Sequence, residues 1–346
     1  MKAAVYLGPG KIEIQKMPVP EIEEDEVLLQ VKACAICGTD VRIYSFGQKN
    51  VKPPHIIGHE VAGVISEVGR RIKGYRKGER VILVTSVGCG RCEMCLQGRP
   101  NLCPENRAIG YYYSGGFAEY MKVPAEAVRQ GNILPIPDSL SFVEATLAEP
   151  LSCCINGQEY LNIGMGDTVV VIGTGPIGCM HAELAKISGA TKVIVADLSE
   201  ERLNFARRIG ADVYVNSQRE SLKEKVMKET EGAGADVVIT ACPSPEAQEE
   251  ALEIIKTRGR ISFFGGLPHE KSKISFDSNI VHYKEVSVFG SFASYAFQYK
   301  KALSLLASKR IRAERFITHK FALEKIEEGI KTVKEGKALK AVVIME

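Results

Sequence analysis

The sequence predicts an α/β protein in which a doubly wound parallel sheet domain is joined to a second, β-rich domain. Two patterns predict this fold class. Apolar strands alternate with helical segments after about residue 152, whereas short β-branched segments separated by turn signals dominate before it. A chain of 346 residues is also long for one hydrophobic core. We therefore expect domains at 1–151 and 152–288, with 289–346 returning to the first domain.

The first part of the chain is predicted to be rich in strands. Val27–Cys34, Val61–Gly69 and Glu79–Val84 are short segments rich in β-branched residues. Gly-Pro, Pro-Pro and Lys-Gly pairs between such segments are typical turn signals.

The second part shows the alternation expected of a parallel sheet. Thr168–Ile172 is a continuous apolar strand, which suits burial on both faces, and a helix is predicted over Ile177–Ser188. An amphipathic helix is predicted over Ser199–Ile209, before Gly210. The other predicted elements are strands at Lys192–Ala196, Val213–Val215, Asp236–Thr240, Arg260–Phe264 and Ala341–Ile344, and helices near Lys300–Leu306 and Ala322–Val333.

The composition is that of an ordinary globular enzyme, with 45% hydrophobic and 25% charged residues. A formal net charge of +3 gives no electrostatic case for a nucleic-acid or membrane partner. Gly8 and Pro9 interrupt the start of the chain before the apolar core of a signal peptide could form. Ten cysteines without an export signal favour metal ligation over disulfides, so we expect a soluble, cytoplasmic protein.

Four cysteines form the most specific local pattern, C-x2-C-x2-C-x7-C at Cys89, Cys92, Cys95 and Cys103. Four thiolates within one glycine-containing loop predict a tetrahedral zinc site, which is structural because no coordination position stays open. The alternative is an iron–sulfur cluster, since Pro104 follows the last cysteine. The last spacing is seven residues where the bacterial cluster pattern has three, so zinc is favoured.

A glycine-rich turn, Gly173-Thr-Gly-Pro-Ile-Gly178, follows a predicted strand and opens a predicted helix. In this context it predicts a dinucleotide site, with the pyrophosphate at the helix N-terminus. Asp197 ends the next strand, where its carboxylate can bind the adenosine ribose and would repel a 2′-phosphate. NAD is therefore favoured over NADP, although the nearby Arg202 could serve either cofactor.

A second metal site is indicated by Cys37 and Thr39 just after a strand, by His59 and Glu60 just before one, and by Glu149 ahead of the sheet domain. Thiolate, imidazole and carboxylate are ligands that zinc accepts, and a catalytic zinc keeps one position for water or substrate. Such a zinc would lower the pKa of an alcohol, whose proton Thr39 would accept. Glu60 either binds zinc directly or supports it while Glu149 binds.

Taken together, these motifs resemble the zinc-dependent medium-chain alcohol dehydrogenases, in particular the branch of sorbitol, polyol, threonine and butanediol dehydrogenases. The resemblance covers essentially the full length and rests on Cys37-Gly-Thr-Asp40, Gly58-His-Glu60, the four cysteines, Glu149-Pro150 and Gly173–Gly178. It implies a GroES-like catalytic domain, a Rossmann domain, two zinc ions per chain, NAD, a small alcohol substrate and a homo-oligomer, either a dimer or a tetramer.

The resemblance also implies roles for single residues. Cys37, His59 and Glu60 match the catalytic zinc motif. Glu149 matches the position of a further zinc ligand or of a partner of the zinc-bound water. Thr39 matches the hydroxyl of the proton relay. The positions that match the family's NAD contacts are Gly173, Gly175, Pro176, Ile177, Gly178, Asp197 and Arg202, with Phe264, Gly265, Gly266 and Ser291 at the nicotinamide half.

One position departs from the family, because Arg42 stands where it usually has a histidine that completes the proton relay. A guanidinium stays protonated and cannot shuttle a proton. Either water or the cofactor ribose completes the relay, or Arg42 binds an anionic substrate group. We favour a surface arginine with the relay completed by water.

Polyol oxidation is the predicted function, since Glu149-Pro-Leu-Ser152 resembles the polyol branch. L-Threonine 3-dehydrogenase or 2,3-butanediol dehydrogenase is the alternative within the enzyme class. A catalytically silent NAD-binding sensor is the alternative outside it.

Overall fold

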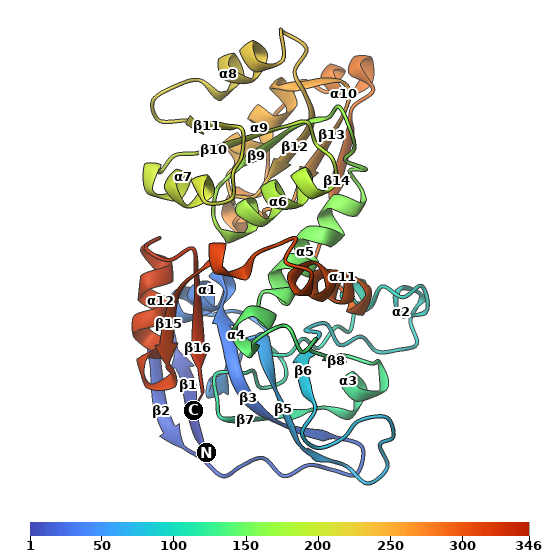
Figure 1. The fold of residues 1–346 in the computed structure, drawn as a ribbon, viewed down its shortest axis with the longest axis vertical. Helices are drawn as coiled ribbons and strands as arrows, with labels where there is room; N and C mark the ends of the chain where they lie inside the picture. The colour runs from blue at the N-terminus through green and yellow to red at the C-terminus, as the bar shows by residue number, and fades with distance from the viewer. Residues whose placement is uncertain (346) are drawn as a thin grey trace. The chain divides into compact units, whose positions relative to one another are not determined.

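The computed structural model describes residues 1–345, which form two compact units. The first unit comprises Met1–Ser152 and the segment from Ala293 onward, and the second comprises Cys153–Phe292. The sequence placed these boundaries after residues 151 and 288. Figure 1 labels the elements in chain order.

The first unit contains two sheets. In the larger, seven-stranded sheet the strand order is β15-β16-β3-β5-β6-β8, and β7 also pairs with β3. Its strands are β3 (Val27–Ile36), β5 (Glu60–Val68), β6 (Arg80–Leu83), β7 (Tyr120–Val123), β8 (Ile133–Pro135), β15 (Ile317–Ala322) and β16 (Lys340–Ile344). The smaller sheet has the order β2-β1-β4, with β1 at Lys2–Gly8, β2 at Lys11–Lys16 and β4 at His55–Ile56.

The last strand of the chain lies beside one of the first. β16 pairs antiparallel with β3, with Ala341 opposite Ile36, and β5 pairs antiparallel with the other edge of β3, with Glu60 opposite Ala35. Because antiparallel neighbours run in opposite directions, the end of β3 lies next to the beginnings of β5 and β16. Cys37, Glu60 and Lys340 are therefore brought to one end of the sheet.

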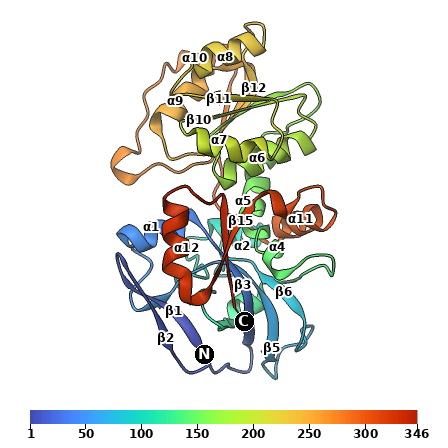
Figure 2. The same ribbon diagram turned by 60° about the vertical axis from the view of Figure 1, so that its left-hand side comes forward.

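Helices flank the sheets of the first unit. They are α1 (Gly38–Phe46), α2 (Glu93–Leu96), α3 (Ala125–Arg129), α4 (Phe142–Ala145), α11 (Ala296–Ala307) and α12 (Ile326–Lys334). Figure 2 shows α12 beside α1 and β15. The hydroxyl of Tyr44 on α1 donates to Glu327 on α12 at 2.8 Å. The core beneath includes Ile36, Ile43, Phe117 and Ile330, which are all buried.

The second unit is a six-stranded parallel sheet in the order β11-β10-β9-β12-β13-β14. Its strands are β9 (Thr168–Ile172), β10 (Lys192–Asp197), β11 (Val213–Asn216), β12 (Ala235–Thr240), β13 (Ile255–Phe263) and β14 (Ser287–Gly290). Its helices are α6 (Pro176–Ile187), α7 (Glu200–Arg207), α8 (Leu222–Glu229), α9 (Pro245–Glu253) and α10 (Asn279–Lys284), and α5 (Ala148–Glu159) enters it from the first unit. Helices α6 and α7 cover one face, and α9 and α10 the other. The predicted fold class is confirmed.

The helix predicted over Ala322–Val333 is wrong at its start. Ala322 is the last residue of β15, Leu323–Lys325 form a turn of 3₁₀ helix, and α12 begins at Ile326. Pairing of β15 with β16 holds Ala322 opposite Ile344, so tertiary pairing overrides the helical propensity of this alanine. Helices α8 and α9 were not predicted, although Ser221 and Ser244 cap them through their hydroxyls.

Among the residues described, no helix combines the length and apolarity that crossing a membrane requires.

We expect Gly63→Ala to destabilise the first unit. An ideal Cβ at Gly63 on β5 would lie 2.3 Å from the backbone oxygen of Gln30 on β3, so the paired strands would have to separate. Overpacking of this kind costs about 1–3 kcal/mol, measurable as a lower midpoint of urea unfolding. Gly38→Ala is the matched control, because nothing lies within 4 Å of its Cβ position. Equal stability of the two variants would contradict the packing argument.

Candidate functional site

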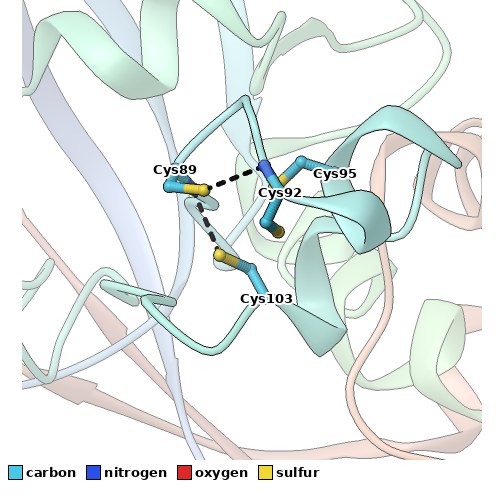
Figure 3. Close-up of side chains that lie close together, drawn as sticks. All are labelled: Cys89, Cys92, Cys95 and Cys103. Atoms are coloured by element: carbon cyan, nitrogen blue, oxygen red, sulfur yellow. Dashed lines mark hydrogen bonds between the residues drawn. The ribbon is translucent and has the colours of Figure 1, made fainter.

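Figure 3 shows the four cysteines gathered around one centre. Atoms that could ligate a metal on Cys89, Cys92, Cys95 and Cys103 all lie within 4.8 Å of one another. Short segments with sharp turns hold them, including α2, which begins directly after Cys92. Gly88 is required by close packing, since a Cβ there would lie 2.5 Å from the sulfur of Cys95.

The same loop makes the thiols electrostatically unequal. The pKa of Cys89 is lowered to about 6, first by the backbone amide of Arg91 and then by that of Cys92. Burial raises the pKa of Cys95 to about 12. Without a cation the four thiols therefore do not ionise together, whereas zinc, which takes thiolates as ligands, would stabilise all four charges. All four are free thiols, so the set fits a structural zinc.

A second set of metal-ligand residues is formed by Cys37, His59 and Glu60, whose candidate ligand atoms also lie within 4.8 Å of one another. Cys37 is the residue before α1, and its backbone amide donates to the Asp40 carboxylate at 2.8 Å. His59 and Glu60 lie where β5 begins, and both are buried.

Asp40 is a residue of this site that the sequence analysis did not assign. It is fully buried, and one carboxylate oxygen lies 3.6 Å from Nδ1 of His59. Metal-binding imidazoles usually donate their second N–H to such a carboxylate, which fixes the ring. The Cys-Gly-Thr-Asp pattern itself was the available signal.

Lys340 is the second residue that sequence analysis missed. Its ammonium lies 2.5 Å from Oε1 of Glu60, and both side chains are almost completely buried. Burial by itself lowers the pKa of Lys340, but the negative charges of Glu60, Cys37 and Glu149 raise it above its ordinary value, so the ammonium stays charged. The only sequence signal was a lysine at the start of the apolar strand Lys340–Ile344.

The other carboxylate oxygen of Glu60, Oε2, is buried and has no hydrogen-bond partner among the described residues. A buried, unpaired carboxylate oxygen is costly, and a divalent cation would remove this cost. The donor set therefore fits zinc, with Cys37, His59 and Glu60 as the residues that would hold it.

Glu149 lies in the first turn of α5 and is not a member of the group within 4.8 Å. Its charge nevertheless acts on both Tyr111 and Lys340, so it belongs to the same electrostatic environment. Tyr111 contacts His59, with ring centroids 5.3 Å apart. The geometry thus includes Glu60 among the grouped ligand candidates, and direct ligation by Glu149 stays a prediction.

Thr39 and Arg42 both lie on α1 but in different surroundings. Thr39 is half-buried in the first turn, two residues after Cys37. Arg42 is exposed, and its guanidinium donates to the side chain of Gln48 at 3.0 Å. This contact favours the interpretation of Arg42 as a surface residue.

The glycine-rich turn has the backbone geometry that a dinucleotide site needs. Gly173 has φ of +99°, which disfavours any residue with a side chain. A Cβ at Gly178 would lie 1.7 Å from the carbonyl oxygen of Gly173, so only glycine fits where α6 packs on the turn. Gly175 precedes α6, whose first residues are Pro176 and Ile177, so backbone amides at this helix end are available to an anion.

Asp197 ends β10 beside this turn. Its Oδ2 accepts from the amide and the hydroxyl of Thr174 at 2.7 and 3.0 Å, and its Oδ1 accepts from the amide of Ser199 at 3.0 Å. These bonds fix the orientation of the carboxylate. Because an ionised carboxylate has about four acceptor positions, it can still bind a ribose hydroxyl.

The other predicted cofactor residues follow neighbouring strands. Phe264, Gly265 and Gly266 come after β13, and Ser291 comes after β14. Carboxyl ends of parallel strands share one edge of the sheet, where ligands bind in folds of this type. The ring of Phe264 packs against His181 on α6, with centroids 4.5 Å apart, so it is a packing group as well as a candidate contact.

Two further residues, Arg202 and Cys242, interact electrostatically near Asp197. Arg202 is exposed on α7, and its positive charge acts on Cys242 together with the negative charge of Asp197. Cys242 follows β12 and lies against both glycine turns, since Cβ atoms at Gly173 and Gly265 would meet it at 3.0 and 2.4 Å. Cys242 therefore acts here as a packing residue.

Comparison with known proteins agrees with this geometry. The model of the alcohol dehydrogenase GroES-like domain matches residues 23–138, and that of the zinc-binding dehydrogenases matches residues 176–308. The chain belongs to the zinc-binding alcohol dehydrogenase family. Zinc and a nicotinamide dinucleotide are accordingly its cofactors, as predicted.

Two curated relatives illustrate the range of names in this family. The chain is 35% identical to the sorbitol dehydrogenase of Bacillus subtilis over 95% of its length and 92% of the relative's. It is 34% identical to the L-threonine 3-dehydrogenase of Pyrococcus furiosus over 96% of its length and 95% of the relative's.

Two solved structures show the same fold with a bound cofactor. A Sinorhizobium meliloti 1021 protein bound to NADP matches with a TM-score of 0.92 and 31% identity, over 99% of this chain and 98% of that one. An Escherichia coli CFT073 protein complexed with NADH matches with a TM-score of 0.90 and 31% identity, over 99% of each chain.

We expect the folded protein to contain two zinc ions per chain, one in each group of ligand residues. Cys37→Ser and Cys95→Ser should each lose one ion, because each removes a thiolate from a different group. Elemental analysis of the purified proteins measures this. A wild-type content of one zinc in active protein, or loss of both ions in either variant while it stays folded, would contradict the assignment.

We also expect Lys340→Met to destabilise the zinc-free protein by about 3–5 kcal/mol, because it leaves the Glu60 carboxylate buried and unpaired. Urea unfolding measures the change, and Lys340→Arg, which keeps the positive charge, is the control. Saturating zinc should restore part of the loss if Glu60 is a ligand. A variant as stable as the wild type without zinc would show that the ion pair contributes nothing.

Proposed function

We propose that the protein oxidises a secondary alcohol of a polyol to a ketone and transfers the hydride to NAD. The observation that supports this most directly is the group of half-buried Cys37 and buried His59 and Glu60, with ligand atoms within 4.8 Å of one another. Three such ligands leave a tetrahedral zinc one position for substrate, which is the arrangement of a catalytic site.

Zinc at that position would act as a Lewis acid that makes the alcohol easier to deprotonate. The chain's own residues divide the remaining work. Thr39 accepts the hydroxyl proton of the alcohol, while Asp40 orients the imidazole of His59 and Lys340 fixes the carboxylate of Glu60. Glu149 adds a negative charge to the same surroundings, as a partner of zinc-bound water.

The substrate class is proposed from the relatives. Both sorbitol and L-threonine have secondary hydroxyl groups, so both names are compatible with the same reaction. We place polyols first because Arg42 is exposed and bound to Gln48, which gives no support for a site that recognises a substrate carboxylate. Threonine and 2,3-butanediol are the second candidates.

The cofactor is proposed to be NAD. The turn Gly173–Gly178 and the start of α6 would hold the pyrophosphate, and Asp197, fixed by Thr174 and Ser199, would bind the adenosine ribose. Phe264, Gly265, Gly266 and Ser291, at the same sheet edge, are proposed for the nicotinamide half.

We further propose that the chain forms a homo-oligomer in the cytoplasm. Strand β14 is the last in its sheet, so its outer backbone groups are available to a second copy. Exposed apolar side chains lie on and near it, with Tyr283 77%, Val288 40% and Phe292 66% exposed. All ten cysteines, each within the described residues, are free thiols, which supports a reducing compartment.

The experiment that tests the function is NAD reduction with sorbitol, xylitol, galactitol, 2,3-butanediol and L-threonine, each repeated with NADP. We expect a polyol signal with NAD that Cys37→Ser abolishes, while Cys153→Ser, which changes a cysteine outside both metal groups, retains it. NAD reduction with threonine or butanediol alone would replace polyols as the proposed substrate class. NAD binding without turnover of any alcohol by the zinc-loaded protein would favour a sensor.

A further inference from the structure

A pocket of about 390 Å³ lies next to Asp197, at the carboxyl ends of β10 and β11. Its lining begins with Leu198 and Ser199, the two residues that follow Asp197, and continues on the loop after β11. The lining residues are Leu198, Ser199, Glu200, Glu201, Asn216, Gln218 and Arg219. A substituent on the ribose held by Asp197 would therefore enter this pocket.

Most of the polar groups in this pocket suit a phosphate. Arg219 supplies a guanidinium, and Asn216, Gln218 and Ser199 supply amides and a hydroxyl, all of which donate hydrogen bonds to phosphate oxygens. A second guanidinium, Arg207, lies close by on α7 and rests on the ring of Tyr214 at 4.7 Å. By composition alone, this pocket resembles one that accepts the 2′-phosphate of NADP.

One carboxylate already uses these donors. Oε2 of Glu200 accepts from the side chain of Asn216 at 3.0 Å and lies 3.7 Å from the guanidinium of Arg219. Oε1 of Glu200 lies 3.4 Å from the guanidinium of Arg207. The carboxylate thus occupies the position among these groups that a phosphate would need.

We propose that Glu200 is a specificity-determining residue that keeps the 2′-phosphate of NADP out of this pocket. The inference rests on the proposed function, in which Asp197 binds the ribose. It assigns a separate role to the carboxylate of Glu200. Asp197 binds the hydroxyl groups of NAD, whereas Glu200 neutralises the arginines that would otherwise attract the phosphate of NADP. A phosphate brought to the pocket meets the carboxylates of Asp197, Glu200 and Glu201, and arginines that Glu200 already pairs.

The charge of Glu200 is secure at neutral pH. Its pKa is lowered, first by the hydrogen bond from Asn216 and then by Arg207 and Arg219. The contacts with the arginines are solvent-exposed, with 39% of the Glu200 side chain accessible, so each contributes little to stability. Removing the carboxylate should therefore change the preference for a cofactor without unfolding the protein.

Glu201 provides a matched control. It lines the same pocket and adjoins Glu200 on α7, and its substitution by glutamine removes the same charge. None of the ion pairs described for Arg207 and Arg219 involves Glu201. A specific effect of Glu200 can thus be separated from a general change in charge.

The experiment titrates the zinc-loaded protein with NADH and with NADPH and follows the nicotinamide fluorescence, so that no substrate is needed. We compare the wild type with Glu200→Gln, Glu201→Gln, Asp197→Ala and the double variant of Asp197→Ala and Glu200→Gln. Glu200→Gln should improve the affinity for NADPH relative to NADH by roughly tenfold, and the double variant should improve it further than Asp197→Ala alone. Glu201→Gln should change the ratio much less, and the gain should shrink at high salt.

An unchanged ratio in Glu200→Gln, or an equal gain in Glu201→Gln, would overturn the proposal. So would a double variant that does no better than Asp197→Ala. Failure of the proposed function gives a different result, because the wild type would then bind NADPH as tightly as NADH, or would bind neither.

Discussion

The buried pair of Glu60 and Lys340 is the interaction on which the first unit and its metal site both depend. Two residues that are 280 positions apart meet because β3 pairs with β5 on one edge and with β16 on the other. Burying either charge without its partner would cost free energy. Strand β16, which carries Lys340, must therefore be in place before the charge of Glu60 is balanced. The pair also leaves Oε2 of Glu60 without a hydrogen-bond partner in the described part of the chain. Folding of the first unit therefore prepares a carboxylate for a metal ion.

A different constraint organises the second unit. Parallel strands all end at one edge of their sheet, so residues that are far apart in sequence are gathered there without any pairing between them. This edge holds the turn after β9, Asp197 at the end of β10, Cys242 after β12 and the glycines after β13. The local requirement is a close approach of backbone to backbone, which explains why Gly178 has no room for a side chain. The backbone shape of the glycine turn thus suits a dinucleotide. Side chains at the same edge of the sheet are expected to discriminate between NAD and NADP.

The parts that were predictable from sequence are those in which neighbours in sequence are also neighbours in space. The four cysteines lie within one loop, and the glycine turn lies between one strand and one helix. Spacing alone therefore predicts a metal site for the cysteines and a dinucleotide site for the turn. Strands such as β9 were predictable because burial on both faces gives a continuous apolar run. The contact of Asp40 with His59 and that of Lys340 with Glu60 were missed because the partners come from other elements, and a single buried lysine has no periodic signal. Ala322 was misplaced because strand pairing, a long-range effect, decided its conformation.

The contrast between buried and exposed residues explains why the relatives share chemistry but not substrate names. Metal ligation needs rigidly held groups, such as half-buried Cys37 and buried His59 and Glu60, and these groups are compatible with any secondary alcohol. Discrimination among substrates or cofactors is a difference between two binding free energies, to which exposed groups on loops and helix ends contribute. Glu200 is one of these groups that contribute to discrimination. We expect its effect where a second, more negative cofactor competes for the same edge of the sheet.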